Sequence, residues 1–145
     1  MARLIDRFYA AMQAEGTAAP VGKLIGFQPT SVEEGKAVFE FEAGPQHANP
    51  MGTLHGGILC DIADAAMGMA YASTLGDGET FTTLELKINF LKPVWQAKLQ
   101  AIGRVVQPGR TVGLVECDIL DADEVLVARA TSTCMTLRGD QARGR

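Results

Sequence analysis

Apolar residues recur every three or four positions between Ile58 and Ala72, the spacing that aligns side chains along one side of an α-helix. The preceding segment, Asn49-Pro50-Met51-Gly52, contains the Pro and Gly residues that favour a tight loop. We therefore predict a loop that leads into a helix of about five turns. Because this helix is apolar over most of its circumference, we expect the rest of the chain to enclose it.

Two carboxylates, Asp61 and Asp64, interrupt this apolar run. Charged groups are seldom buried without a partner or a task, so both require an explanation. Asp61 lies about one helical turn before Asp64 and nearly on the same face. Either could belong to a solvated helix face or act as a cap partner, and this interpretation is favoured for Asp61.

Patterns of other kinds flank the central helix. Residues 2–15 are amphipathic and predict a helix that ends at Gly16, followed by a loop over 17–20. Alternating apolar and polar residues predict strands over 23–33, 35–42, 80–91, 98–106, 111–120 and 124–137. The segment 80–91 alternates most clearly and predicts one face with Leu84, Leu86, Ile88 and Phe90 and another with Thr83, Glu85, Lys87 and Asn89.

This order of elements favours an α+β fold over a parallel βαβ fold, because strands precede and follow a single long helix. An antiparallel sheet wrapped around that helix would bury its apolar surface. A chain of 145 residues is long enough for one domain with a real core. We expect that domain over residues 1–138 and a flexible polar tail over 139–145.

Composition excludes several classes of protein. A net charge of −4 provides no basic surface for nucleic acid. With two His and three Cys, none in a CxxC pair, we expect neither a metal site nor another cofactor. No apolar leader follows the charged N-terminus and no run is long enough to span a bilayer, which predicts a cytoplasmic protein with no membrane partner.

Gly56 and Gly57 lie where the predicted helix begins. The first backbone N–H groups of a helix have no intrahelical partner and carry partial positive charge, so they can hold an anion or a developing oxyanion. Without side chains, both residues let a carbonyl group approach the backbone closely. The alternative is that they only mark the change from loop to helix.

The residues His47-x-Asn49-x-x-Gly52-x-x-His55-Gly56-Gly57, with Asp64 nine positions after His55, resemble the motif of the hotdog-fold acyl-CoA thioesterases. The similarity is greatest to the PaaI-like, phenylacetate-pathway branch, which includes 4-hydroxybenzoyl-CoA thioesterases of this architecture. It implies the hotdog fold, a curled antiparallel sheet around one long helix. The motif covers less than a fifth of the chain.

The resemblance also implies roles for individual residues. The residue matching Gly56 offers its N–H to the thioester carbonyl, and Asp64 is the base or the nucleophile. Asn49 and His55 orient substrate and water, and the Thr83 position often carries a Ser or Thr that touches the site. His47 is expected to shape the loop.

Two of these residues also have a structural interpretation. His55 could be a structural residue near the helix start, and Thr83 could point outward from the sheet. Arg110, in the turn after Pro108 and Gly109, is a candidate for binding the CoA phosphates.

Helix geometry separates the two halves of this predicted site. Nine residues of helix rise about 13.5 Å, and the rotation places Asp64 across the axis from His55. One thioester carbon cannot lie near both Gly56 N–H and Asp64 of the same helix. Two helices that lie antiparallel across a twofold axis would remove the conflict. We therefore expect a homodimer with a shared site, and a homotetramer as a dimer of dimers.

The predicted activity is hydrolysis of an acyl-CoA thioester to a carboxylic acid and CoA. Two alternatives stay open at this point. One is a thioester hydratase or dehydratase, although the catalytic His motif of those enzymes is absent from this sequence. The other is a non-catalytic acyl-CoA-binding or regulatory protein, in which Asp64 would have no task.

Overall fold

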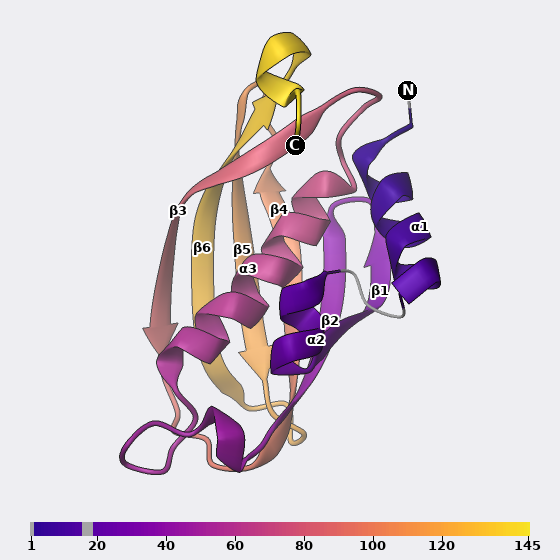
Figure 1. Cartoon of the computed structure of the whole chain (residues 1–145). Coiled ribbons are helices and arrows are strands. Elements are labelled where there is room, and N and C mark those ends of the chain that lie inside the picture. The colour runs from indigo at the N-terminus through magenta and orange to yellow at the C-terminus, as the bar shows by residue number, and fades with distance from the viewer. Residues whose placement is uncertain (1, 16–18) are drawn as a thin grey trace.

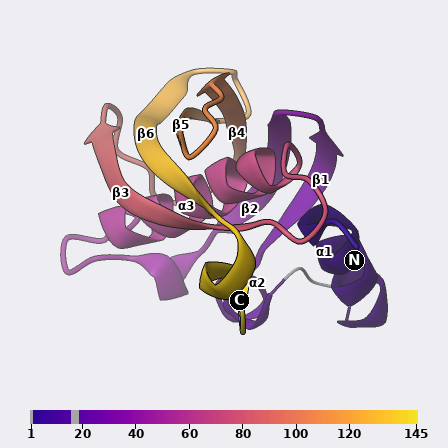
Figure 2. The ribbon, with the colours of Figure 1, turned by 90° about the horizontal axis from the view of Figure 1, so that it is seen from above.

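A six-stranded antiparallel sheet curls around one long helix in the computed structural model, which describes residues 2–15 and 19–145 (Figures 1 and 2). The elements are α1 (Leu4–Glu15), α2 (Pro20–Ile25), β1 (Phe27–Glu33), β2 (Lys36–Ala43), the 3-10 helix η1 (Pro45–His47), α3 (Gly56–Ala72), β3 (Thr80–Phe90), β4 (Ala97–Gln107), β5 (Val112–Leu120), β6 (Leu126–Leu137) and the 3-10 helix η2 (Gly139–Ala142). The predicted α+β hotdog arrangement is confirmed.

The strand order is β1-β2-β4-β5-β6-β3, and every neighbouring pair is antiparallel. The sheet does not close into a barrel, so β1 and β3 are its two edges. Figure 2 shows the sheet arching over α3, with β3 on one side of the helix and β1 on the other. The helices α1 and α2 lie beside β1 (Figure 1).

The sheet covers the two halves of α3 unequally. Every residue from 66 to 72 is buried, whereas Gly57, Asp61 and Asp64 are exposed on the N-terminal half. The cover is close because Gly103 of β4 has no side chain: a Cβ there would lie 2.4 Å from the carbonyl oxygen of Ala66. In the part of the chain that the structure describes, no helix is long and apolar enough to cross a membrane.

The first predicted strand begins too early, because the residues from Pro20 to Ile25 form α2. Pro20 lies at the start of this helix, where its missing N–H costs no hydrogen bond. Gly26 ends the helix in the left-handed conformation, with a φ of 100°. The strand therefore starts at Phe27 rather than at Lys23. The predicted helix end at Gly16 and residues 17 and 18 of the predicted loop lie outside the described residues.

A β-bulge in β3 changes which side chains face the helix. Thr83 pairs with Cys134 and Glu85 with Thr133, so Leu84 is an extra residue in the strand. The predicted faces of this strand are therefore wrong for Thr83 and Leu84, because they assume an uninterrupted alternation, and they hold for the residues after the bulge. Leu84 is 53% exposed. The side chains that share the inner face with buried residues of β6 are Thr83, Leu86, Ile88 and Phe90.

The end of the chain is ordered in part. Gly139–Ala142 forms η2, and the preceding Arg138 donates from Nε to Glu79 Oε1 at 2.6 Å. The flexibility of the tail over 139–145 stays a prediction.

Replacement of Gly103 by Ala should destabilise the fold by about 3 kcal/mol, because the added methyl group overlaps the backbone of α3. Urea denaturation measures the change in the free energy of unfolding. Gly76→Ala is the matched control, since a Cβ at Gly76 would make only an ordinary contact with Glu79 at 3.5 Å. Equal stability of the two variants would contradict the close contact between α3 and β4.

Candidate active site

The loop before α3 is held together by the side chain of Asn49. Its Oδ1 accepts hydrogen bonds from the N–H groups of Met51 (3.0 Å) and Thr53 (3.2 Å), and its Nδ2 donates to Thr53 Oγ1 (2.7 Å). Gly52 completes the turn with a φ of 90°, a conformation that favours glycine. Asn49 thus determines the shape of the loop that leads to His55.

His55 is the N-cap of α3, and its Nδ1 accepts a hydrogen bond from Gly57 N–H at 3.0 Å. The neutral ring therefore carries its proton on Nε2. A Cβ at Gly57 would lie 3.1 Å from this Nδ1, so the absence of a side chain leaves room for the ring. The Gly57 N–H is therefore occupied by the cap.

The N–H of Gly56 is a hydrogen-bond donor at this helix start. Gly56 is the first residue of α3, and no group within residues 2–15 and 19–145 accepts a hydrogen bond from its N–H. Phe90, at the end of β3, packs against it: a Cβ on Gly56 would lie 2.8 Å from Phe90 Cζ. The donor therefore lies beside an aromatic ring. The sequence placed Phe90 on the apolar face of a strand but did not predict its contact with Gly56.

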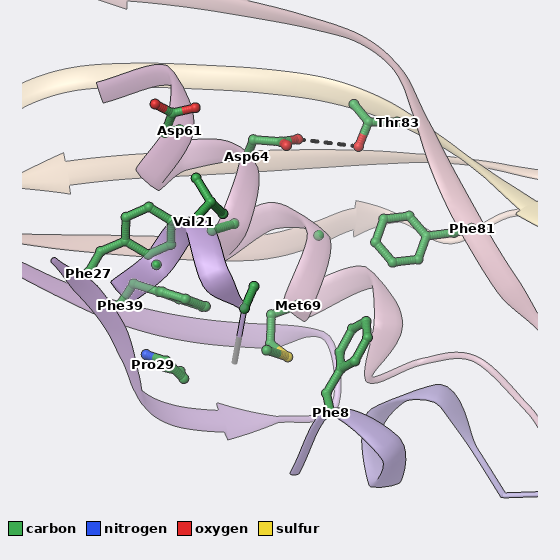
Figure 3. A pocket seen from close by; sticks show the side chains of 14 residues that line it. Phe8, Val21, Phe27, Pro29, Phe39, Asp61, Asp64, Met69, Phe81 and Thr83 are labelled. Atoms are coloured by element: carbon green, nitrogen blue, oxygen red, sulfur yellow. Dashed lines mark hydrogen bonds between the residues drawn. The ribbon is translucent and has the colours of Figure 1, made fainter. Parts of the chain in front are cut away.

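Asp64 and Thr83 meet at the middle of α3. Thr83 Oγ1 donates to Asp64 Oδ1 at 3.3 Å, and the bulge in β3 is what turns Thr83 toward the helix (Figure 3). Asp64 as a whole residue is exposed to solvent. Its carboxyl group is partly buried by surrounding atoms, and this loss of hydration raises its pKa. The hydrogen bond from Thr83 opposes this rise because it stabilises the carboxylate.

The surroundings of Asp61 are less suited to a catalytic role than those of Asp64. Partial burial raises its pKa, and the negative charge of Asp64 raises it further. Figure 3 shows the hydrogen bond from Thr83 to Asp64, and Asp61 lies apart from this pair. No side chain within the two described ranges donates a hydrogen bond to it. These features fit the solvated helix face expected for Asp61.

An apolar cavity of about 300 Å³ opens beside Asp64. Thr83 and the two carboxylates lie along one side of it, and Phe27, Pro29 and Phe39 lie on the other (Figure 3). The remaining lining residues come from α1, the α2 region, α3 and β3: Phe8, Ala19, Val21, Gly22, Ala65, Gly68, Met69 and Phe81. The sequence analysis did not predict that the N-terminal segment lines this cavity. The apolar stripe of residues 4–12 was the signal that could have indicated it.

The structure separates the predicted site residues into three places. Asn49, His55 and Gly56 belong to the loop and helix start, and Asp64 and Thr83 lie at the cavity. Arg110 is exposed in the turn between β4 and β5, which lies at the same end of the sheet as the C-terminal half of α3. No group of three or more His, Cys, Asp or Glu within the described ranges could hold a metal ion.

Comparisons with known proteins identify the family of this chain. The family model described as "Thioesterase superfamily" matches residues 51–128. The chain belongs to the thioesterase superfamily. Membership makes it a hydrolase of the hotdog fold. A Saccharolobus solfataricus relative named as a candidate esterase is 36% identical over 116 residues, which are 80% of this chain and 82% of that protein.

Two further proteins are similar to this chain. The 1,4-dihydroxy-2-naphthoyl-CoA hydrolase of Listeria monocytogenes is 29% identical over 109 residues, which are 75% of this chain and 89% of that enzyme. The PaaI protein of the Escherichia coli phenylacetic acid degradation operon superposes with a TM-score of 0.82 and 25% identity, covering 93% of this chain and 94% of that one. The resemblance to the PaaI-like branch is confirmed.

Replacement of Thr83 by Val should raise the pKa of Asp64 further, because it removes the hydroxyl that stabilises the charged form. A carboxyl-carbon NMR titration of the labelled protein measures this change directly. Thr82→Val, one residue earlier on the strand, is the control and should leave the pKa of Asp64 unchanged. A lower pKa in the Thr83 variant would contradict the assigned hydrogen bond.

Proposed function

We propose that this protein hydrolyses acyl-CoA thioesters to a free carboxylic acid and CoA. The observation that carries the proposal is the Asp64 carboxyl group, held by Thr83 at the rim of an apolar cavity. The cavity would take the acyl group, and the acid would act on the thioester at its mouth. The name of the Listeria relative describes hydrolysis of a CoA thioester, which supports this choice of substrate. A cytoplasmic location is part of the same proposal.

The chemistry has two requirements, and different groups would meet them. Asp64 would take a proton from water as the water oxygen attacks the thioester carbon, and its raised pKa suits a general base. The Gly56 N–H, at the positive end of α3, would stabilise the oxyanion, an effect typically worth a few kcal/mol. The C–S bond then breaks, and the thiolate of CoA receives the proton. Direct attack by Asp64 to form a mixed anhydride is the alternative route.

One protomer cannot supply both groups to the same carbon atom. Gly56 and Asp64 are eight positions apart on α3, so the helix separates them by about 12 Å along its axis. A second copy of the chain with its α3 antiparallel would bring the partner's Gly56 to this Asp64. The functional unit proposed here is therefore a dimer with two shared sites, and a tetramer would join two such dimers.

The open edge of β3 supports this dimer. Within the described sheet β3 pairs only with β6, and it leaves Leu84, Phe90 and the adjoining Leu91 each more than half exposed. A long apolar edge of this kind is a template for pairing with another strand. Antiparallel pairing of two β3 edges would place the Thr83 end of one strand beside the Phe90 end of the other. Asp64 of one protomer would then approach the helix start of its partner.

Replacement of Asp64 by Asn should lower the rate of thiol release from acyl-CoA by about 10²–10⁴-fold, the usual contribution of a general base. The fold should persist, which circular dichroism verifies. Asp61→Asn is the matched control and should cost far less. If the Asp61 variant proves the more damaged enzyme, the reactive carboxylate has been misassigned. No thiol release by the wild-type chain across a panel of acyl-CoAs would favour a binding protein or a hydratase instead.

The shared site is tested by mixing two inactive variants, Asp64→Ala and Gly56→Pro, under conditions in which subunits exchange. Proline removes the N–H and is tolerated at the first position of a helix. Half of randomly paired dimers are mixed, and each of these has one intact site, so activity should return to roughly a quarter of wild type. Labelled subunits verify exchange. A site built within one protomer predicts no recovery at all.

A further inference from the structure

His47 lies between the loop before α3 and the helix α2. It is 7% exposed, and its ring packs edge-on against Phe41 with the centroids 4.7 Å apart. Its backbone carbonyl accepts a hydrogen bond from His55 N–H at 2.9 Å. His47 is thus an integral part of the loop that ends in the N-cap of α3.

Both nitrogens of the His47 ring have partners. Gly44 N–H donates to Nδ1 at 3.0 Å, so Nδ1 is the acceptor and the ring proton lies on Nε2. Nε2 donates to the carbonyl oxygen of Ile25 at 2.8 Å. One bond therefore stays within the segment around η1, and the other crosses to the C-terminal end of α2.

The bond to Ile25 adds a hydrogen bond to the contacts that hold α2, in which Ile25 packs against the core and Gly22 lies against Phe27. The helix has six residues, and only Gly22 is buried, whereas Leu24 is 84% exposed. The last carbonyl groups of a helix have no intrahelical donor, and His47 supplies one to Ile25. Val21 and Gly22 of the same helix line the apolar cavity beside Asp64.

We propose that His47 is a positioning residue for acyl selectivity, which fastens the α2 wall of the cavity to the loop before α3. The inference rests on the proposed function, in which this cavity receives the acyl group. The loop is a firm anchor because Asn49 and the bond between His55 N–H and the His47 carbonyl tie it together. His47 does not touch the reacting atoms. It acts through α2 on acyl groups long enough to reach that wall.

Two substitutions separate the two bonds of the ring. His47→Asn retains an acceptor near the Nδ1 position for Gly44 N–H but cannot reach Ile25. His47→Gln places an amide donor near the Nε2 position for Ile25 and loses the acceptor for Gly44. The kcat/KM of each variant is measured with acetyl-CoA, whose acyl group is too short to reach α2, and with hexanoyl-CoA, whose chain extends into the cavity.

In the Asn variant, the ratio of kcat/KM for hexanoyl-CoA to that for acetyl-CoA should fall about tenfold, the scale of one lost hydrogen bond. In the Gln variant the ratio should stay within about twofold of wild type, even where both rates decrease. A general structural defect would lower kcat/KM for both substrates by the same factor and leave the ratio unchanged. An unchanged ratio in the Asn variant overturns the proposal.

Hydrogen–deuterium exchange provides a measurement that is independent of catalysis. The amides of residues 22–26 should exchange about tenfold faster in the Asn variant than in wild type or the Gln variant, and the amides of 49–55 should not change. Unchanged exchange over 22–26 also overturns the proposal. If the wild-type chain releases no thiol, the proposed function fails, and this exchange measurement still decides whether His47 fastens α2.

Discussion

The close contact between the backbones of α3 and β4 is the constraint on which the rest of the molecule depends. The carbonyl of Ala66 occupies the space that a side chain at position 103 would need, so only glycine allows the sheet to approach this near. Tight enclosure buries the C-terminal half of α3 on all sides and anchors the helix rigidly. The N-terminal half extends from this cover with its outer side open, and both groups proposed for chemistry lie there.

The environment of the acid follows from a local irregularity in the sheet. An uninterrupted β3 would turn Thr83 outward and leave the Asp64 carboxyl group without its hydroxyl partner. The extra residue at Leu84 brings Thr83 to the inner face and places a leucine outside, on the edge that the proposed dimer would cover. The same bulge thus places Thr83 beside Asp64 and exposes Leu84 on the edge of the sheet.

The N-terminal segment adds what the sheet and α3 lack, a cover for the cavity. Phe8 from α1, with Val21 and Gly22 from α2, lines part of it, although Gly22 is the only buried residue of α2. This short helix packs on the core through Ile25, and the hydrogen bond from His47 joins its C-terminal end to the loop before α3. His47 belongs to the same motif that supplies the helix-start donor.

The sequence by itself determined the central helix, the succession of helix and strands along the chain, and the positions of the loop and helix start that precede Asp64. These features depend on local rules: a three-to-four residue apolar period, Pro and Gly punctuation, and a motif contained in one continuous segment. The tertiary structure decided the direction of Thr83, the helix at Pro20–Ile25 and the packing of Phe90 on Gly56. The direction of Thr83 and the packing of Phe90 result from contacts between residues distant in the chain, whereas α2 begins at Pro20 and ends at Gly26, local signals that the strand prediction overlooked. The bulge, above all, is set by the pairing of β3 with β6 and leaves no mark in the alternation of β3 itself.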